Sequence, residues 1–472
     1  MVKAAGASGA WLDRLARRCS GYANYAWNGN TYSIGGGCNN GYWAGSTALA
    51  VDTQTWNALS LVGSELQPQA TFVQRKQRSL YRAAVDMVIT EEWNGVTYSG
   101  TVFSPTGAGI QWENTGAAFL AFEWFLETIS DGPAVTSQIN CNANAEACAI
   151  ATSRDTLKTS MLTIVKHRAQ LLQTTGDEKY QGVSSSLRAN GAPSGFGWVY
   201  FDFPHVASTG FVGMALEVAL AGGDVHKYNP YSVFVQYSGA AAVWAALSSG
   251  QTQPVCPSGQ TSQTDDISIV RGHMDTYLTY MNSKRGELIA FNEDPDFFSF
   301  ITFIVPPSYV RHNLIETYDS SVMTIYFLGR ADDEIANMPR AACYLKAAVD
   351  AARTLLRLMQ AGGYKPGLET PQLRLGSFKG LFARYPAWVS GFPPGTPTPA
   401  YDAVGDLGNN ACKPSFGYAI TPMPISVSCV IYCVESPRST YHFTVTPSAK
   451  CRLIIRVLHR ERQLRMRHHF LT

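Results

Sequence analysis

Two acidic residues stand at the start of apolar segments and have the spacing to carry out acid–base chemistry. Asp52 lies in LAVDTQTWNALSL, and Glu113 lies in GIQWENTGAAFLAF, directly before a long apolar run. Two positioned carboxyl groups can act as a general acid and a general base when their surroundings separate their pKa values. Asp52 and Glu113 are therefore the first candidates for catalytic residues.

The surroundings of these carboxyl groups suggest different roles. A helix N-terminus favours a carboxylate and lowers its pKa, which suits Asp52 as a base. Glu113 follows Trp112 and precedes apolar residues, so partial burial is expected to raise its pKa and to suit it as an acid. Asp202 is the reserve candidate for either role. The alternatives are a helix N-cap for Asp52 and a hydroxyl acceptor or structural partner for Glu113.

The elements that would position these residues are helices of two kinds. Amphipathic segments are expected at residues 74–89, 155–172 and 341–360, each with one apolar and one polar face. Segments that are apolar nearly all round are expected at residues 55–63, 116–129, 206–222 and 321–329. A helix without a polar face must be buried on all sides. The two kinds together predict a mainly α fold with an inner layer and an outer layer, as in a helical toroid built from hairpins.

Each apolar helix is preceded by a cluster of polar and aromatic residues. Capping explains the Asp and Asn residues, but it does not explain why Trp and Tyr recur at the same ends. If the inner helices run parallel, these clusters meet on one face and line one pocket. The residues concerned are Asp52, Gln54 and Trp56; Trp112, Glu113 and Asn114; Trp198, Tyr200, Asp202 and His205; Glu316, Tyr318 and Asp319; and Asp402, Asp406, Asn409 and Asn410.

Several of these stretches resemble the six-hairpin glycosidases, which are (α/α)6 toroids. The stretches are LAVDTQTWNALSL, QWENTGAAFLAF, GFGWVYFDFPHVASTGF and NPY, and the resemblance covers residues 10–232. A second match at residues 315–422 includes ETYDSSVMTIYFLGRADDE and YDAVGDLGNNACKPSFGYAI. The first match is similar to the later hairpins of such a toroid, and the second is similar to the opening hairpins.

The resemblance implies four segments, with two readings left open. Residues 10–250 would form the C-terminal part of a toroid, and residues 311–427 would form the N-terminal part. Residues 251–310 would be a linker and irregular segment, with a short strand or two at 285–310. The two parts either close into one permuted ring or are incomplete pieces of two tandem domains. The basic tail at 428–472 is expected to lie outside the fold, as non-native sequence or as an arm for an anionic partner.

The resemblance also implies a function, namely hydrolysis of a neutral poly- or oligosaccharide by paired carboxyl groups. The side chains expected to bind the sugar are Trp56, Trp112, Asn114, Trp198, Tyr200, His205, Tyr318 and Asp319. The polar clusters carry almost no Lys or Arg, which disfavours a uronate substrate. A polysaccharide lyase and a non-catalytic carbohydrate-binding or scaffold protein are the alternatives. Glu91 and Glu92 are expected at the end of an outer helix, away from the pocket.

Composition limits other classes of function. The net charge is +2 and only 15% of residues are charged, so no nucleic-acid partner is expected. No apolar run is long enough for a membrane span, and no metal or cofactor motif occurs. Among ten cysteines, Cys141 and Cys148 are close enough for a loop disulfide or can be two free thiols. A secreted or cell-surface location is left open, although the first residues lack the apolar core of a signal peptide.

Overall fold

The computed structural model of the chain is mainly helical in the part that it describes. The described residues are 27–32, 36–39, 42–45, 49–60, 70–130, 139–167, 182–188, 191–196, 199–200, 202–231, 235–257, 265–283, 298, 300, 314–360, 384–386, 414–417 and 425–429. The helices are α2 (Val51–Ser60), α3 (Ala70–Asp86), α4 (Trp112–Ser130), α5 (Ala145–His167), α6 (Val206–Ala221), α7 (Ser238–Ser248), α8 (Asp266–Ser283), α9 (Thr317–Asp333) and α10 (Met338–Gln360).

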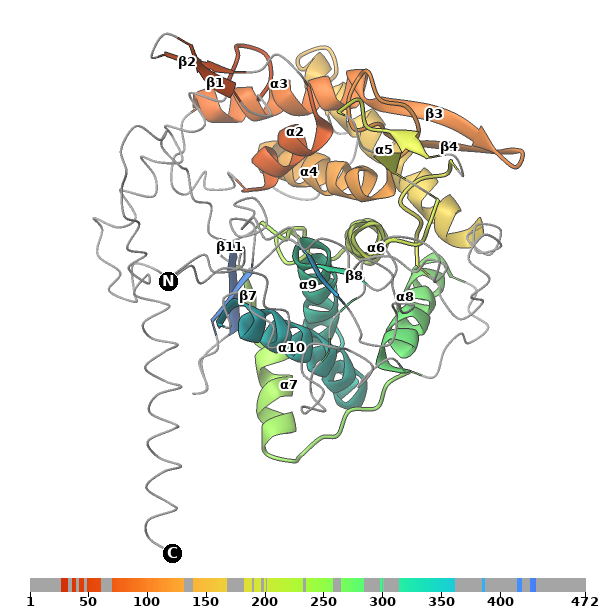
Figure 1. The fold of residues 1–472 in the computed structure, drawn as a ribbon, viewed down its shortest axis with the longest axis vertical. Helices are drawn as coiled ribbons and strands as arrows, with labels where there is room; N and C mark the ends of the chain where they lie inside the picture. Colours follow the sequence, from red (N-terminus) through yellow and green to blue (C-terminus); the bar gives the residue numbers. More distant parts are fainter. Residues whose placement is uncertain are drawn as a thin grey trace, which may run out of the picture.

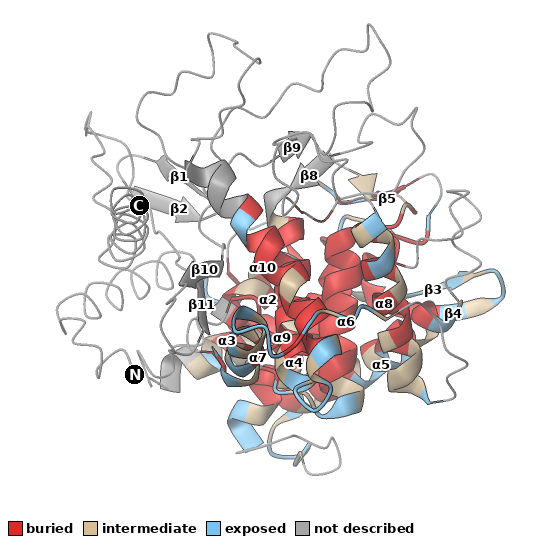
Figure 2. Ribbon diagram, turned by 90° about the horizontal axis from the view of Figure 1, so that it is seen from below, coloured by how far each residue is buried: buried red, intermediate tan, exposed pale blue. Residues whose placement is uncertain are grey.

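Helices α4, α6 and α9 form the centre of the core. Helix α6 is buried at every residue from 206 to 218, as expected for a helix that is apolar all round. Helix α4 packs against α2 on one side and α6 on the other, and α6 packs in turn against α9. Helices α3, α5, α8 and α10 cover this row from outside, and α7 packs on α9 and α10 (Figures 1 and 2).

The central helices approach one another closely near their N-termini. A Cβ atom on Gly116 of α4 would lie 2.6 Å from the backbone carbon of Phe211 in α6. A Cβ atom on Gly210 of α6 would lie 2.9 Å from the Val322 side chain in α9. In each case residues about one turn into both helices meet, so the three N-termini lie at the same end of the layer.

The strands are short, and most of them form two-stranded pairs. The antiparallel pairs are β1 (Gly36–Asn39) with β2 (Tyr42–Gly45), β3 (Val88–Trp93) with β4 (Val96–Thr101), β5 (Ala192–Pro193) with β6 (Val199–Tyr200), and β8 (Leu314–Glu316) with β9 (Arg384–Pro386). The exception is a three-stranded sheet, in which β11 (Ile425–Cys429) lies between β10 (Pro414–Gly417) and β7 (Gln236–Tyr237).

The hairpin of β3 and β4 corrects one sequence prediction. The helix expected at 74–89 ends at Asp86, and Glu91 and Glu92 lie on β3 rather than at a helix end. Asn94 and Gly95 both have positive φ, 50° and 75°, which a two-residue hairpin turn requires. The Asn-Gly pair was the sequence signal for this turn. The Glu91 carboxylate accepts the Ile110 N–H at 2.8 Å, so it supports the approach to α4 instead of facing away from it.

Part of the segment expected to be a linker is also regular. Helix α8 lies within residues 251–310 and packs against α6 and α5. Its apolar residues recur at helical spacing, and this periodicity was available in the sequence; they are Ile267, Val270, Met274, Tyr277, Leu278 and Met281. The strands expected at 285–310 lie outside the described residues, apart from Phe298 and Phe300. Of the tail expected at 428–472, Ser428 and Cys429 belong to β11 and pair with β10, and the rest lies outside the described residues.

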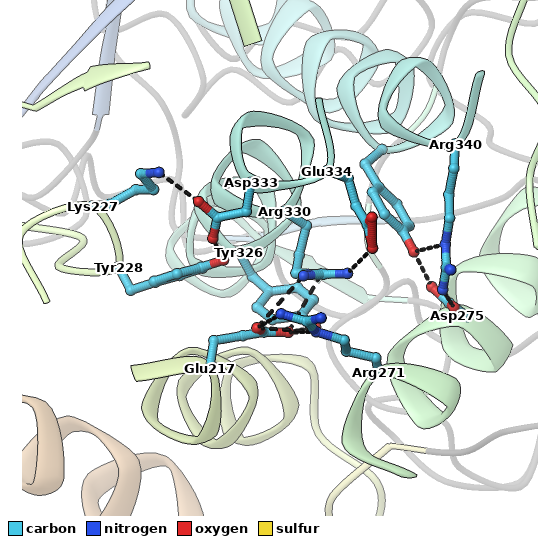
Figure 3. Close-up of polar contacts among 11 residues, drawn as sticks. Glu217, Lys227, Tyr228, Arg271, Asp275, Tyr326, Arg330, Asp333, Glu334 and Arg340 are labelled. Atoms are coloured by element: carbon cyan, nitrogen blue, oxygen red, sulfur yellow. Dashed lines mark hydrogen bonds and ion pairs between the residues drawn. The ribbon is translucent and has the colours of Figure 1, made fainter. Parts of the chain in front are cut away.

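A buried network of charged side chains fastens α6, α8 and α9 at the end of α6 far from its N-terminus (Figure 3). Glu217 is fully buried in α6 and accepts hydrogen bonds from Arg271 of α8, with Nη2 to Oε2 at 2.8 Å. The Nε atom of Arg330 in α9 lies 3.3 Å from Oε1 of the same carboxylate. Farther along, Asp275 of α8 accepts a hydrogen bond from the Tyr344 hydroxyl of α10 at 2.5 Å.

Both parts of the chain contribute to one core, and two disulfides reinforce it. The core cluster includes residues of α2 to α8 together with residues of α9 and α10. Cys141 is bonded to Cys148 before and within α5, and Cys256 is bonded to Cys343 of α10 across 87 positions of sequence. Among the described helices, none has the length and apolarity that crossing a bilayer requires.

Candidate active site

Backbone hydrogen bonds bring the starts of α2, α4 and α6 together. The Val51 N–H at the start of α2 donates to the carbonyl of Phe103, which follows β4. The Trp112 N–H at the start of α4 donates to the Ser185 carbonyl at 3.1 Å, and the His205 N–H before α6 donates to the Val183 carbonyl at 2.9 Å. The segment 182–188 therefore links the N-termini of α4 and α6 and fixes the side chains that follow them.

Glu113 occupies the first turn of α4, and its side chain is 12% exposed. Burial raises its pKa from an ordinary 4.5 to about 7. His205 opposes this shift, Asp319 adds to it, a hydrogen bond with Tyr318 opposes it, and Asp52 adds to it. Side chains from α2, from α9 and from the residue before α6 thus act on one carboxyl group of α4. A carboxyl group that holds its proton near neutral pH is suited to act as a general acid.

Asp52 is partly exposed in the first turn of α2 and is electrostatically coupled to Glu113. Burial raises its pKa from 3.8 to about 6, although the backbone and hydroxyl of Thr53 both donate to its carboxylate. The sequence suggested a lowered pKa from the helix N-terminus, and the structure shows that loss of water outweighs the amide contacts. The two carboxyl groups still differ, and Glu113 has the higher pKa.

His205 lies between carboxyl groups from two other helices. Its Nε2 atom is 3.2 Å from Oδ2 of Asp319 in α9, and its Nδ1 atom is 3.9 Å from Oε2 of Glu113 in α4. Nδ1 also lies 3.0 Å from the Ser208 hydroxyl. Ser208, His205 and Asp319 have the composition of a serine-hydrolase triad, but Ser208 is fully buried in α6. Its hydroxyl cannot reach an acyl substrate, so it acts as a support for the imidazole.

Aromatic side chains cover one side of this group. Trp56 of α2 lies 5.3 Å from Tyr318 of α9 and 5.7 Å from Tyr231, measured between ring centroids. The hydroxyls of Tyr231 and Tyr318 are 3.4 Å apart. Trp56 and Tyr318 both retain partial exposure, whereas Tyr231 is buried. A flat, partly exposed aromatic surface beside ionisable carboxyl groups is typical of sites that bind sugar rings.

The site cluster is therefore Asp52, Trp56, Glu113, His205, Tyr318 and Asp319, all of them proposed from the sequence, together with Tyr231 and Ser208, which were not. Tyr231 belongs to an Asn-Pro-Tyr stretch that forms a tight turn, in which Asn229 Oδ1 accepts the Tyr231 N–H at 2.9 Å. The same asparagine donates to the Leu59 carbonyl near the end of α2 at 3.1 Å. The turn-forming asparagine beside a tyrosine was the signal in the sequence.

Other proposed residues have different surroundings. Trp112 is fully buried against Tyr98, 6.1 Å between ring centroids, and presents no surface to a sugar. Asn114 is buried and donates to the Gln111 side chain at 2.9 Å. Tyr200 is partly exposed and packs on Phe103. Asp202 is buried before α6, and burial raises its pKa. Trp198 lies outside the described residues, as do Asp402, Asp406, Asn409 and Asn410.

No family description, curated protein or solved structure matches this chain in comparisons with known proteins. Within the described ranges, no group of three His, Cys, Asp or Glu side chains is placed to hold a metal ion.

Proposed function

We propose that the chain is a carbohydrate-active enzyme that hydrolyses a neutral poly- or oligosaccharide. The observation that carries this proposal is that Asp52 and Glu113 each lie in the first turn of a helix with a raised pKa, about 6 and about 7, and that Asp52 adds to the shift of Glu113. Glycoside hydrolysis needs one carboxyl group that is protonated and one that is ionised at the working pH. The order of the two pKa values would let Glu113 keep its proton at a pH where Asp52 is ionised.

The pKa order assigns the roles. Glu113, with the higher pKa, would protonate the leaving glycosidic oxygen, and Asp52 would activate water or attack the sugar carbon. Asp202 is the reserve candidate for either role, because it is also buried and has a raised pKa. Trp56 and Tyr318 would bind the apolar face of a sugar ring, since both are aromatic and partly exposed, Tyr318 interacts with Glu113, and Trp56 lies against Tyr318.

The scaffold we propose for this chemistry is a toroid of helical hairpins. The inner row would be α2, α4, α6 and α9, and the outer layer would include α3, α5, α8 and α10. The close approach of α4, α6 and α9 near their N-termini supports this arrangement. The face at those N-termini is where a toroid of parallel inner helices would present its active site.

A lyase is the weaker alternative on this site. A lyase needs a Tyr or His base, and the pKa of Tyr318 is raised far above its ordinary value by burial, Tyr231 and Glu113. That shift makes the phenolate harder to form. A non-catalytic sugar-binding protein would use the same aromatic surface but would show no turnover.

The test is an assay of hydrolysis on a panel of neutral polysaccharides, in which the release of reducing ends is measured. Glu113→Gln and Asp52→Asn should each lower kcat by about 10²–10⁴-fold while retaining glycan binding in calorimetry. Glu92→Gln, on the exposed face of the β3–β4 hairpin, is the matched control and should keep full activity. Equal activity of Glu113→Gln and the parent enzyme would remove the site assignment. Binding without turnover by the parent would favour the non-catalytic alternative, and unsaturated products would favour the lyase.

A further inference from the structure

Hydrogen bonds fix both the backbone and the ring of His205. Its N–H donates to the Val183 carbonyl, and its carbonyl accepts from the Thr209 hydroxyl at 2.7 Å. The Thr209 hydroxyl also accepts the Val183 N–H at 2.9 Å. The backbone of His205 is thus fixed between segment 182–188 and the first turn of α6, which leaves only the ring torsions to be set.

Two side chains set those torsions. Asp319 is 2% exposed and lies against Nε2, so the natural arrangement has Nε2–H donating to its carboxylate. Ser208 lies against Nδ1 and is fully buried in the same helix. With Nε2 facing α9, the Nδ1 edge of the ring faces Glu113 of α4 at 3.9 Å. The ring orientation is therefore determined by groups that a substrate cannot displace.

The exposure of these residues also disfavours direct sugar contact. His205 is 5% exposed and Asp319 is 2% exposed, whereas Asp52, Trp56 and Tyr318 keep more surface. A sugar hydroxyl would reach the partly exposed group first. The sequence predicted that His205 and Asp319 bind substrate. Their burial instead favours an indirect role, in which they act on Glu113.

We propose that His205 is a positioning residue whose protonated imidazole, 3.9 Å from Glu113, lowers the proton affinity of that carboxyl group, and that Asp319 fixes its ring for this purpose. The inference rests on the proposed function only for its consequence in catalysis, because the geometry of the three side chains is independent of any substrate. The ionisable groups that act on Glu113 besides His205 are Asp52 from α2, and Tyr318 and Asp319 from α9. His205 is the basic side chain beside them, and it is cationic when both ring nitrogens are protonated.

In this arrangement His205 would restrain the proton affinity of Glu113. Burial and two neighbouring carboxyl groups raise the pKa of Glu113, and the positive imidazole opposes them. Without it, Glu113 would hold its proton too tightly to release it to a leaving group and to recover it in each cycle. The contact between Asp319 and His205 keeps the imidazole close to the Glu113 carboxyl group.

The experiment measures the titration of Glu113 directly and does not depend on turnover. The infrared carbonyl band of protonated Glu113 is isolated as the difference between parent and Glu113→Gln spectra and is followed from pH 4 to 9. In His205→Gln we expect the midpoint to rise by about one pH unit, because the opposing charge is gone. In the Asp319→Asn background the same substitution should move the midpoint by less than half as much, since the ring is no longer fixed.

Ser208→Ala is the structural control, and it should move the midpoint by less than about 0.3 unit because no charge is removed. His205→Asn replaces His205→Gln if the latter does not fold, as judged by circular dichroism. An unchanged midpoint in a folded His205 variant would overturn the proposal, and so would equal shifts with and without Asp319.

The activity profile separates this inference from the proposed function. If the parent hydrolyses glycans, the alkaline limb of its pH profile should move upward in His205→Gln in parallel with the infrared midpoint. If the parent hydrolyses none and the midpoint still moves, the glycosidase proposal fails and the inference that His205 lowers the proton affinity of Glu113 stands. If hydrolysis occurs and the midpoint does not move, the inference about His205 fails and the glycosidase proposal stands.

Discussion

Glu113 and Asp52 both favour the protonated state in the folded protein, because burial raises their pKa values to about 7 and about 6. The unfolded chain would release these protons near pH 4 to 5. Between the unfolded and folded pKa values the folded state therefore binds more protons, and stability falls as pH rises. The stabilisation is complete below about pH 4 and is lost by about pH 7.

This linkage predicts a stabilised variant at the candidate site. Glu113→Gln keeps the size of the side chain and cannot ionise, so its free energy of unfolding should exceed that of the parent by roughly 1 to 3 kcal/mol at pH 8. The gain should shrink toward zero at pH 4.5. Urea denaturation at the two pH values measures the difference, and Glu92→Gln on the exposed hairpin should show no such pH-dependent gain. A gain of the same size at both pH values would mean that packing, not ionisation, is responsible.

The residues of the candidate site could be proposed from sequence to different degrees. Asp52, Glu113 and His205 share a simple pattern, a polar side chain directly before an apolar helix, and the structure places all three together. Trp112 has the same position in sequence, yet its ring points to Tyr98 in the core. Neighbours along a helix start point in different directions, about 100° apart, so sequence position alone does not determine which of them faces the site.

At the scale of elements, the contact between α4 and α6 depends on a residue without a side chain. A Cβ atom at Gly116 would lie 2.6 Å from the backbone of Phe211, a distance that requires the helices to separate. Gly116→Ala should therefore destabilise the protein by about 1 to 3 kcal/mol despite the better helix propensity of alanine. Because Glu113 and His205 lie one turn away, activity should fall as well.

Gly272 in α8 is the matched control, since no atom lies within 4 Å of a Cβ built on it. Gly272→Ala should leave stability unchanged or raise it by about 0.5 to 1 kcal/mol through helix propensity and a restricted unfolded chain. Thermal unfolding of the two variants compares them directly. A stable, active Gly116→Ala protein would show that the α4–α6 spacing is not as close as the structure has it.

The network around Glu217 makes a second prediction at this scale. Glu217 is 0% exposed and faces two guanidinium groups, Arg271 and Arg330 (Figure 3). Glu217→Gln would leave two cations without their carboxylate in the interior, and such a loss costs about 3 to 5 kcal/mol. Glu146→Gln, which breaks the more exposed pair with Arg78, should cost less than about 1 kcal/mol. Equal effects in guanidinium denaturation would contradict the burial of the network.

The distance of this network from the site makes the prediction specific. His205 and Glu217 are twelve residues apart in α6, about 18 Å along the axis. Glu217→Gln should therefore lower stability with little change in kcat at a temperature where the protein remains folded. A large loss of kcat under those conditions would indicate that the network positions the site as well as the helices.

At the scale of the whole molecule, periodicity in the sequence predicted the helices better than it predicted their connections. The helices expected at 206–222 and 341–360 correspond closely to α6 and α10, because each has a continuous apolar pattern. The β3–β4 hairpin was missed because the apolar residues Met87, Val88 and Ile89 around the start of β3 follow the apolar pattern of α3 with only Asp86 between them. The packing of α9 on α6 could not be read from sequence, since it joins segments about a hundred residues apart.

The disulfide between Cys256 and Cys343 fastens the α7–α8 connection to α10, and the Val255 N–H donates to the Pro339 carbonyl beside it. It closes 87 positions of sequence, whereas Cys141–Cys148 closes 7. Loop-closure entropy gives stabilisations of about 5 and about 2 kcal/mol respectively at 25 °C. Cys256→Ala with Cys343→Ala should therefore lower the free energy of unfolding by more than Cys141→Ala with Cys148→Ala.

Both double variants are compared by urea denaturation, with reduced parent protein as the reference for loss of both bonds. Disulfides persist in oxidising compartments, so the parent should also fold with higher yield under oxidising than under reducing conditions. If removal of the 87-residue link costs no more than removal of the short one, the unfolded chain must already hold α10 near the α7–α8 connection. In that case α7 to α10 would retain structure after the rest of the core is lost, and hydrogen exchange in those helices would outlast exchange in α2 and α3.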